Sequence, residues 1–146
     1  SFELRFAQIR DLKKVLRAEA IVYGRLPLMI TENCLVQNET GCRLDRQGPC
    51  VPEDGPCRCG QPNVLVDRTG AAFPLLPAYG HRTEIQNSKP LYLADRPEHR
   101  RLGLAYARLR FTTETAEECV SVVQNYLDAA PAAGDFTRGL YERGVE

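Results

Sequence analysis

The run from residue 31 to residue 63 constrains the fold most, because it holds five of the six cysteines and shows almost no apolar periodicity. Four glycines and four prolines interrupt it, and these residues predict turns rather than a helix or a strand. A loop of this length inside a compact domain needs its own source of order. Ligation of a metal by thiolates would supply that order. The cysteines of this run are Cys34, Cys42, Cys50, Cys57 and Cys59.

The overall composition is that of an ordinary globular domain. The 146 residues are 43% hydrophobic and 26% charged, and a chain of this length can bury a core unaided. The formal net charge is +0, so no overall field draws the chain towards nucleic acid or an anionic membrane. No apolar run approaches the roughly 18 residues of a membrane-spanning helix, so we expect no membrane span.

The first residues lack both an initiator methionine and the pattern of a signal peptide. We therefore interpret the chain as a piece cut from within a longer cytoplasmic protein. Reducing compartments disfavour disulfides, so the clustered cysteines favour metal binding or redox chemistry. Cys119 lies apart from the others and is expected to be a small core residue.

The periodicity predicts helices and strands on both sides of the Cys-rich run. The expected strands cover residues 20–23, 26–30, 64–66, 72–76, 81–86, 90–93 and 105–112. The expected helices cover residues 6–16, residues 96–104 with Asp95 as N-cap, and a segment that begins at Thr113. In the last helix an apolar stripe is expected to face the core. Its members are Val120, Val123, Tyr126 and Leu127.

The sharpest local motif is Cys57-Arg58-Cys59, in which two thiolates on a flexible loop can reach one metal. Soft thiolates favour zinc or an iron–sulfur cluster. Cys34, Cys42 and Cys50 could add ligands; the alternative is a set of buried or free thiols. His81 could complete such a site, although a lone histidine is often only a hydrogen-bonded structural residue.

The other motifs exclude several enzyme classes. The chain has no nucleophile elbow, no zinc-protease helix, no phosphate loop and no dinucleotide fingerprint. Sixteen of the 19 basic residues are arginine, which binds phosphate and carboxylate as a planar fork, although a compositional habit of the genome explains the bias equally well. His99 lies among charged residues and is expected to be solvated.

Four segments resemble the U32 collagenase-like peptidase family, in the order of that family. They are Glu19–Cys34 (EAIVYGRLPLMITENC), Leu65–Pro74 (LVDRTGAAFP), Arg82–Leu91 (RTEIQNSKPL) and Arg108–Glu114 (RLRFTTE). The resemblance implies an N-terminal TIM-like barrel in the parent protein. Residues 1–30 would then be the end of that barrel, residues 31–95 the Cys-rich loop with a β-rich subdomain, and residues 96–146 a helix-strand-helix part. The expected fold class is α+β, a small antiparallel β-rich domain with flanking helices that includes the last strand and helix units of the barrel.

The resemblance also implies a cofactor. Members of the family include oxygen-independent hydroxylases of RNA and of ubiquinone precursors, which use prephenate and hold a 4Fe–4S cluster on four cysteines. Cys34 and Cys59 match two of those ligands, and Cys57 matches a paired cysteine of related sequences. Where the family has a further cysteine, this chain has His81. His81, Cys42 or Cys50 could replace that ligand, or the site could hold zinc.

The parent protein is therefore expected to be an iron–sulfur hydroxylase that acts in RNA modification or on a quinone precursor. Arg25, Arg68 and Arg82 are candidate contacts for phosphate or carboxylate. The expected partners are the rest of the parent barrel and RNA, and the isolated chain is expected to be inactive. The alternatives are a collagenase-type peptidase and a metal-stapled interaction module without catalysis.

Overall fold

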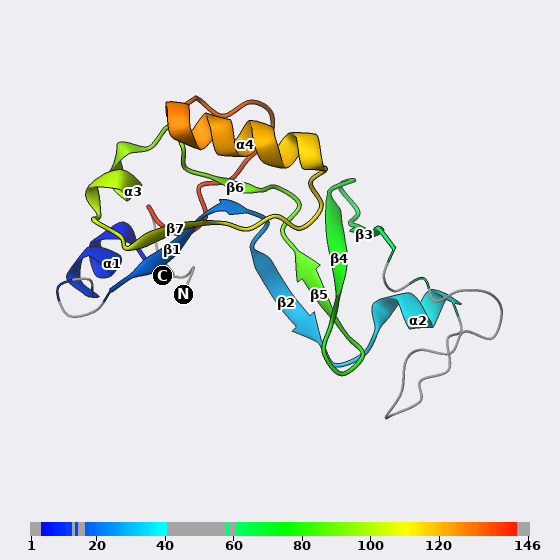
Figure 1. Cartoon of the computed structure of the whole chain (residues 1–146). Helices are drawn as coiled ribbons and strands as arrows, with labels where there is room; N and C mark the ends of the chain where they lie inside the picture. Colours follow the sequence, from blue (N-terminus) through cyan, green and yellow to red (C-terminus); the bar gives the residue numbers. More distant parts are fainter. Residues whose placement is uncertain (1–3, 13, 15–16, 41–57, 59–60, 143–146) are drawn as a thin grey trace. The chain divides into compact units, whose positions relative to one another are not determined.

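The computed structural model describes residues 4–12, 14, 17–40, 58 and 61–142 (Figure 1). The chain divides into two compact units. Residues 1–26 and 89–146 form one, called here the terminal unit, and residues 27–88 form the other, the central unit. Both combine helices with a sheet, and four of the five described strand pairs are antiparallel, so the α+β prediction is confirmed.

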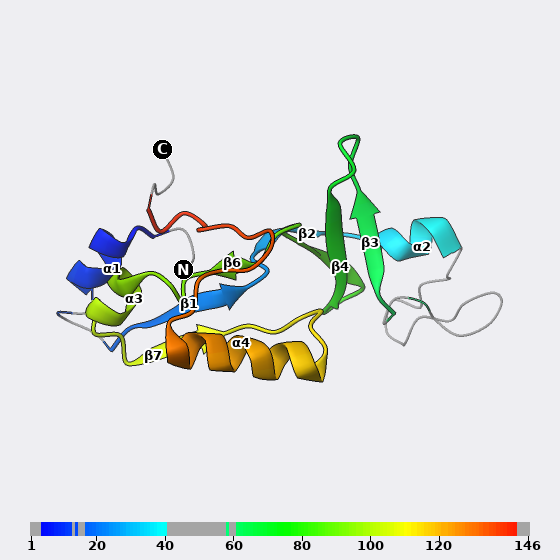
Figure 2. The same cartoon turned by 90° about the horizontal axis from the view of Figure 1, so that it is seen from above.

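The terminal unit contains a three-stranded sheet with the strand order β6-β1-β7. The middle strand β1 (Glu19–Gly24) is antiparallel to β6 (Leu91–Tyr92) and parallel to β7 (Tyr106–Leu109). Figure 2 shows the helix α4 (Ala116–Asp128) running beside this sheet on the side of β7. The short helices α1 (Phe6–Leu12) and α3 (Pro97–Arg101) belong to the same unit.

Two tyrosines fasten this unit by donating hydrogen bonds to carbonyls of β1. The Tyr126 hydroxyl of α4 donates to the Val22 carbonyl (2.5 Å) and accepts from the Leu93 N–H (2.8 Å). The Tyr141 hydroxyl donates to the Ile21 carbonyl (2.6 Å). Buried backbone groups need such partners, and each tyrosine ring also fills apolar volume beside them. The core around these contacts is continuous. Its buried residues are Ile9, Val22, Leu26, Leu91, Leu93, Leu102 and Tyr141.

The central unit contains a four-stranded antiparallel sheet with the strand order β2-β5-β4-β3. Its strands are β2 (Pro27–Thr31), β3 (Asn63–Val66), β4 (Ala72–Ala78) and β5 (Arg82–Gln86). The predicted hairpin is confirmed. Its turn is closed by the Asp67 carboxylate, which accepts from the Thr69 N–H (2.8 Å), the Thr69 hydroxyl (2.7 Å) and the Ala71 N–H (3.0 Å). An Asp side chain that bonds the backbone just ahead of it is a local turn signal.

One helix lies where the sequence predicted no regular element. The helix α2 (Leu35–Thr40) begins inside the Cys-rich run. Its first N–H, from Leu35, donates to the Thr83 hydroxyl of β5 (3.0 Å), and its Val36 side chain is buried. Thr83, which is distant in the sequence, therefore caps the start of α2, and burial of Val36 adds a contact with the core.

The predicted helix boundaries need three corrections. The last helix begins later than predicted, with Thr115 as N-cap and a capping box in which Glu118 reciprocates, so Thr113 is not the cap. The N-cap of α3 is Arg96, whose guanidinium has no acceptor for a cap bond, and the predicted cap Asp95 binds Arg138 instead. The first helix ends at Leu12, and much of its predicted continuation lies outside the described residues.

The apolar stripe of α4 is the largest departure from the sequence prediction. Val120, Val123 and Leu127 are 71%, 42% and 69% exposed, and only Tyr126 of the predicted stripe packs against the core. Cys119, which was expected in the core, is only half-buried. The stripe exists, but the described part of the terminal unit leaves most of it uncovered.

A glycine in β1 provides the first test of this packing. Gly24 has φ +116, and a Cβ built there would overlap the Arg110 carbonyl oxygen, so we expect Gly24→Ala to lower the free energy of unfolding by about 3 kcal/mol or more. Gly134→Ala is the matched control. Its φ is also positive (+79), but a Cβ there would meet no described atom within 4 Å, so we expect about 1 kcal/mol. Urea unfolding followed by circular dichroism measures both values, and equal losses would contradict the predicted steric overlap.

The ion pair between Asp95 and Arg138 provides a second test, in the pH dependence of stability. The two bonds measure 2.6 and 2.7 Å, and the hydrogen bonds from Arg138 lower the pKa of Asp95 below the ordinary value of 3.8. The folded state therefore holds the charged carboxylate more tightly, and its stabilisation is complete above about pH 4 and lost at lower pH. We expect Asp95→Asn to lower stability at pH 7 by about 1–3 kcal/mol and to weaken the acid-induced loss.

The control for Asp95→Asn is Asp11→Asn, which removes an exposed ion pair with Lys14. Surface pairs contribute little, so we expect its unfolding midpoint to stay close to that of the unaltered chain. Denaturant titrations at pH 7 and pH 3 distinguish the two variants. A pH profile for Asp95→Asn parallel to that of the unaltered chain would show that the carboxylate does not titrate as described.

Candidate functional site

The central unit gathers candidate ligands at one end of its sheet. Neighbouring strands are antiparallel, so β2 and β4 finish at the end where β3 and β5 begin; this is called here the sheet end. At this end the last residue of β2, Thr31, is paired with Thr83 of β5, and the last residue of β4, Ala78, is paired with Arg82 of β5. Figure 1 shows β2 and the β4–β5 turn finishing together.

Cys34 lies at the sheet end, directly after β2, and is only 4% exposed. Its position is fixed by a pair of threonines. The Thr83 N–H donates to the Thr31 hydroxyl oxygen (3.2 Å), which lies 2.5 Å from the Asn33 carbonyl oxygen. The Leu35 N–H on the other side of Cys34 is held by Thr83 as well. The residues that flank the thiol are therefore fastened to β5 before any ligand is considered.

His81 reaches the same end from the β4–β5 turn. The β2–β5 pairing ends with Thr31 opposite Thr83, two residues after His81 in the chain. His81 is half-buried and has φ +58, a left-handed conformation that is uncommon for a residue with a Cβ. Such backbone strain concentrates at functional sites, which makes it a reason to consider His81 as a ligand.

Arg58, which stands between Cys57 and Cys59 in the sequence, contacts the start of β3. Its carbonyl oxygen accepts hydrogen bonds from the Asn63 side chain (2.8 Å) and the Gln61 N–H (3.1 Å), and Asn63 is the first residue of β3. Cys57 and Cys59 themselves lie outside the described residues, as do Cys42 and Cys50. Among the described residues, no group of three His, Cys, Asp or Glu side chains is close enough to hold a metal ion.

The candidate arginines do not form one surface. Arg82 lies at the sheet end, exposed, with an ion pair to Glu32 (3.1 Å). Arg68 is exposed in the β3–β4 turn at the opposite end of the seven-residue strand β4, so the two are separated by about 20 Å of strand. Arg25 belongs to the terminal unit, where its Nε donates to the Thr113 hydroxyl (3.4 Å).

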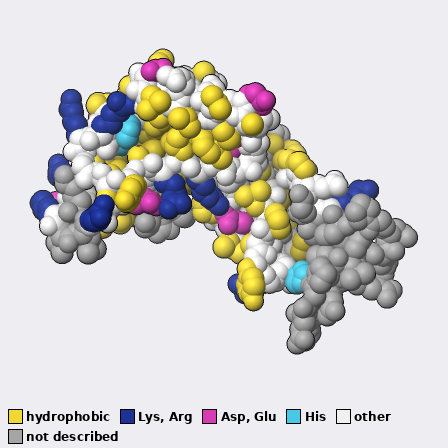
Figure 3. Space-filling view, in the orientation of Figure 1, with side chains coloured by type: hydrophobic (Ala, Val, Ile, Leu, Met, Phe, Trp, Pro, Cys, Tyr) yellow, Lys and Arg dark blue, Asp and Glu magenta, His cyan; other side chains and the backbone are white. Residues whose placement is uncertain are grey.

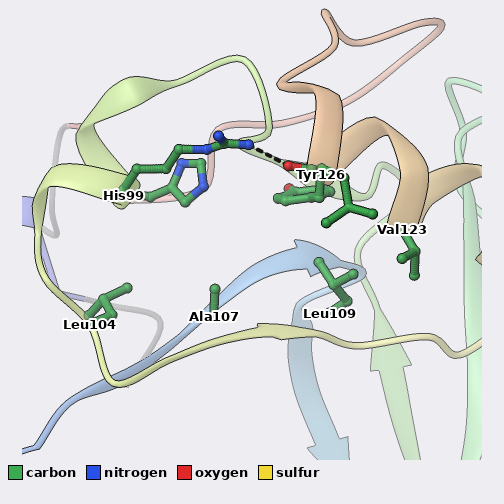
Figure 4. Close-up of a pocket in the computed structure, with 8 residues that line it drawn as sticks. His99, Leu104, Ala107, Leu109, Val123 and Tyr126 are labelled. Carbon is green, nitrogen blue, oxygen red and sulfur yellow. Dashed lines mark hydrogen bonds between the residues drawn. The ribbon is translucent and has the colours of Figure 1, made fainter.

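A second site, which the sequence did not indicate, lies in the terminal unit. A pocket of about 440 Å³ opens between α3, β7 and α4 (Figure 4). Its walls are mostly apolar, with two basic side chains at one end. The residues that line it are His99, Arg100, Leu104, Ala107, Leu109, Val123, Tyr126 and Leu127.

His99 is buried at the edge of this pocket, so the prediction that it is solvated was wrong. Its Nδ1 lies 2.5 Å from the Arg96 carbonyl oxygen, which can only accept, so Nδ1 carries the proton and Nε2 remains an acceptor. Arg100 donates to the Tyr126 carbonyl and ties α3 to α4. The signal that could have revealed this burial is the spacing of His99 and the buried Leu102, which are three residues apart and share one helix face.

The burial of His99 can be tested by measuring its pKa. Burial lowers the pKa of the imidazole below its ordinary value of 6.5, and the hydrogen bond to Arg96 only partly opposes that shift. We therefore expect a proton NMR titration midpoint for His99 below 6.5, with His99→Gln used to assign its signal. The unfolded chain takes up this proton first, so stability contributed by neutral His99 is present above pH 6.5 and falls as pH drops below it. A midpoint at or above 6.5 would show that the ring is solvated.

Comparisons with protein-family models, with characterised proteins and with solved structures give no match for this chain. Within the described ranges, the helices are too short or too polar to span a bilayer.

Proposed function

We propose that the sheet end of the central unit holds a thiolate-ligated metal centre. Its ligands are Cys34, Cys57 and Cys59, and the fourth is His81, or Cys42 in its place. A 4Fe–4S cluster is the first candidate for the bound group, and a zinc ion is the alternative.

The observation that carries this proposal is the placement of Cys34. Its thiol is buried, and the residues on both sides of it are bonded to Thr83 of β5 or to Thr31, which Thr83 also binds. Sulfur and imidazole ligands suit both iron–sulfur clusters and zinc, so the proposed donor set fits the group in its chemistry.

The parent protein is, on this proposal, an oxygen-independent hydroxylase of RNA or of a quinone precursor. The proposal draws on the resemblance to the U32 family and is supported by the cysteine positions. Within it, residues 1–30, which include β1, belong to the end of a TIM-like barrel, whose other strands are partners of this chain. Arg82, exposed at the sheet end, is the arginine best placed to meet an anionic substrate near the metal.

A metal-stapled module without catalysis is the second candidate, and one observation favours it. On the sheet face that carries the buried Leu75 and Ile85, Met29 and Leu65 remain 56% and 45% exposed. So sparse a core leaves the central unit short of apolar stabilisation, and ligation would then contribute folding free energy directly.

The test is the metal content and visible spectrum of the full chain purified without oxygen. We expect a brown protein with about four irons per chain, or a colourless one with about one zinc. Cys34→Ser is expected to lose most of the bound metal, because it removes the one thiolate that the fold positions. Cys119→Ser is the matched control, since Cys119 lies in the terminal unit and its loss should leave the metal content unchanged.

The outcomes separate the candidates. Iron with the broad visible absorption of a cluster supports the hydroxylase proposal, whereas zinc with a chelator-induced loss of structure supports the stapled module. Full metal content in Cys34→Ser, or no metal in the unaltered chain, would overturn the proposed centre.

A further inference from the structure

We propose that the groove between β7 and α4 binds an extended strand of a partner polypeptide, with apolar side chains at alternate positions and acidic residues beside them. The partner strand would pair with the open edge of β7 and place its apolar side chains in the pocket of the terminal unit. This inference concerns the terminal unit alone and does not depend on the metal centre proposed above.

The open edge of β7 supplies the backbone partners. In the order β6-β1-β7, the described strands give β7 one neighbour, β1. The Ala105 N–H donates to the Ala18 carbonyl of the chain entering β1 (2.8 Å). Backbone polar groups alternate between the two sides of a strand, so Tyr106 directs its N–H and carbonyl, and Arg108 its N–H, to the open side. The register shifts after Arg108, and the Arg110 N–H donates to the Tyr23 carbonyl of β1 (2.9 Å). The open side is therefore a short edge, to which one added strand can pair in the known mode of β-augmentation.

The apolar surface beside that edge supplies the side-chain sites. The pocket of about 440 Å³ has β7 as one wall and α4 as the other. Leu127 and Val123 of α4, which line it, are 69% and 42% exposed. Figure 3 shows apolar side chains gathered over this part of the terminal unit. A groove between a strand edge and an apolar helix face fits an extended peptide, whose alternate side chains point towards the helix.

The charges around the groove indicate an acidic partner. Arg100 lines one end of the pocket, and Arg101 follows it in the last turn of α3. Arg17 lies over the Tyr106 ring (5.8 Å), on the face of β7 opposite the pocket, where the side chains of an added strand that do not enter the pocket would lie. Arg108 on β7 is the only one of these with a carboxylate partner among the described residues, namely Glu19 (2.6 Å). Acidic residues of a partner strand would meet the other three.

The acidic residues of α4 do not balance these arginines, because the helix turns them away. Glu117, Glu118 and Asp128 lie more than about 100° around the helix from Val123. A second copy of this chain is also a poor occupant. Antiparallel pairing of β7 with itself would bring two copies of Arg108 to adjacent cross-strand positions, and like charges there are destabilising.

The experiment selects binders from a display library of short random peptides against the full chain. Peptides retained by the Leu127→Asp variant are removed by counter-selection. We expect the enriched peptides to alternate apolar residues and to carry Asp or Glu. The best of them, synthesised with a fluorophore, should bind the unaltered chain saturably in fluorescence anisotropy. We expect Leu127→Asp to weaken that binding at least about tenfold, because it places a carboxylate in the apolar wall of the groove.

Two controls make the result specific. Val66→Asp places the same charge on an exposed apolar residue of the central unit (62% exposed) and should leave the affinity unchanged. Arg100→Gln should weaken binding and reduce its salt dependence, whereas Arg10→Gln, on exposed α1, should do neither. In hydrogen exchange, binding should slow the amides of Tyr106 and Arg108, which side-chain docking alone would leave unchanged.

Three results would overturn the proposal. The first is a selection that enriches no peptide whose binding depends on Leu127. The second is groove-dependent binding without protection of the Tyr106 and Arg108 amides, which would show that the edge of β7 is not used. The third is a Leu127-dependent dimer in analytical ultracentrifugation, which would make a second copy the occupant.

Discussion

The pairing of β1 on both of its sides is the constraint on which the rest of the structure depends. One side of this strand meets β6 and the other meets β7, and both partners follow the whole central unit in the sequence. The entropy cost of such long-range closure must be offset by contacts that form only after closure. The hydroxyl of Tyr126 is one of these, because it joins a carbonyl of β1 to the backbone that follows β6. The pairing of β1 also requires Gly24, because a side chain at this position would overlap the backbone of Arg110.

The features that the sequence predicts correctly are those with local causes. The hairpin of β3 and β4 depends on Asp67, whose carboxylate bonds the next few residues of its own turn. The start of α4 also has a local signal, because Thr115 and Glu118 have the spacing of a capping box, but the prediction named Thr113, which is an equally good cap on residue type alone. Asp95 differs. Its partner Arg138 stands 43 residues away, and no local pattern distinguishes that ion pair from a cap. The start of α2 depends on Thr83, 48 residues from Leu35, for the same reason.

The candidate metal site shows the same division between local chemistry and distant geometry. The residue types of the Cys-rich run predict soft-metal ligation, and that prediction needs no fold. What the sequence cannot supply is the fastening of Cys34 beside β5, because this requires the contact between Thr31 and Thr83 across 52 residues. The arginines illustrate the converse. Arg68 and Arg82 are close in the sequence, but each hairpin strand reverses the direction of the chain, so the length of β4 separates them.

The uncovered stripe of α4 shows what periodicity measures. Apolar residues at helical spacing establish that one face of a helix avoids water, but they do not identify the surface that covers it. In the terminal unit Tyr126 reaches the core, while Val123 and Leu127 face a groove whose other wall ends in an open strand edge. A helix face left apolar beside a strand edge that no described strand covers is prone to association, and this is the basis on which we propose a partner there. The chemistry of that partner follows from what remains unsatisfied: backbone groups on one wall, apolar side chains on the other, and arginines around the rim.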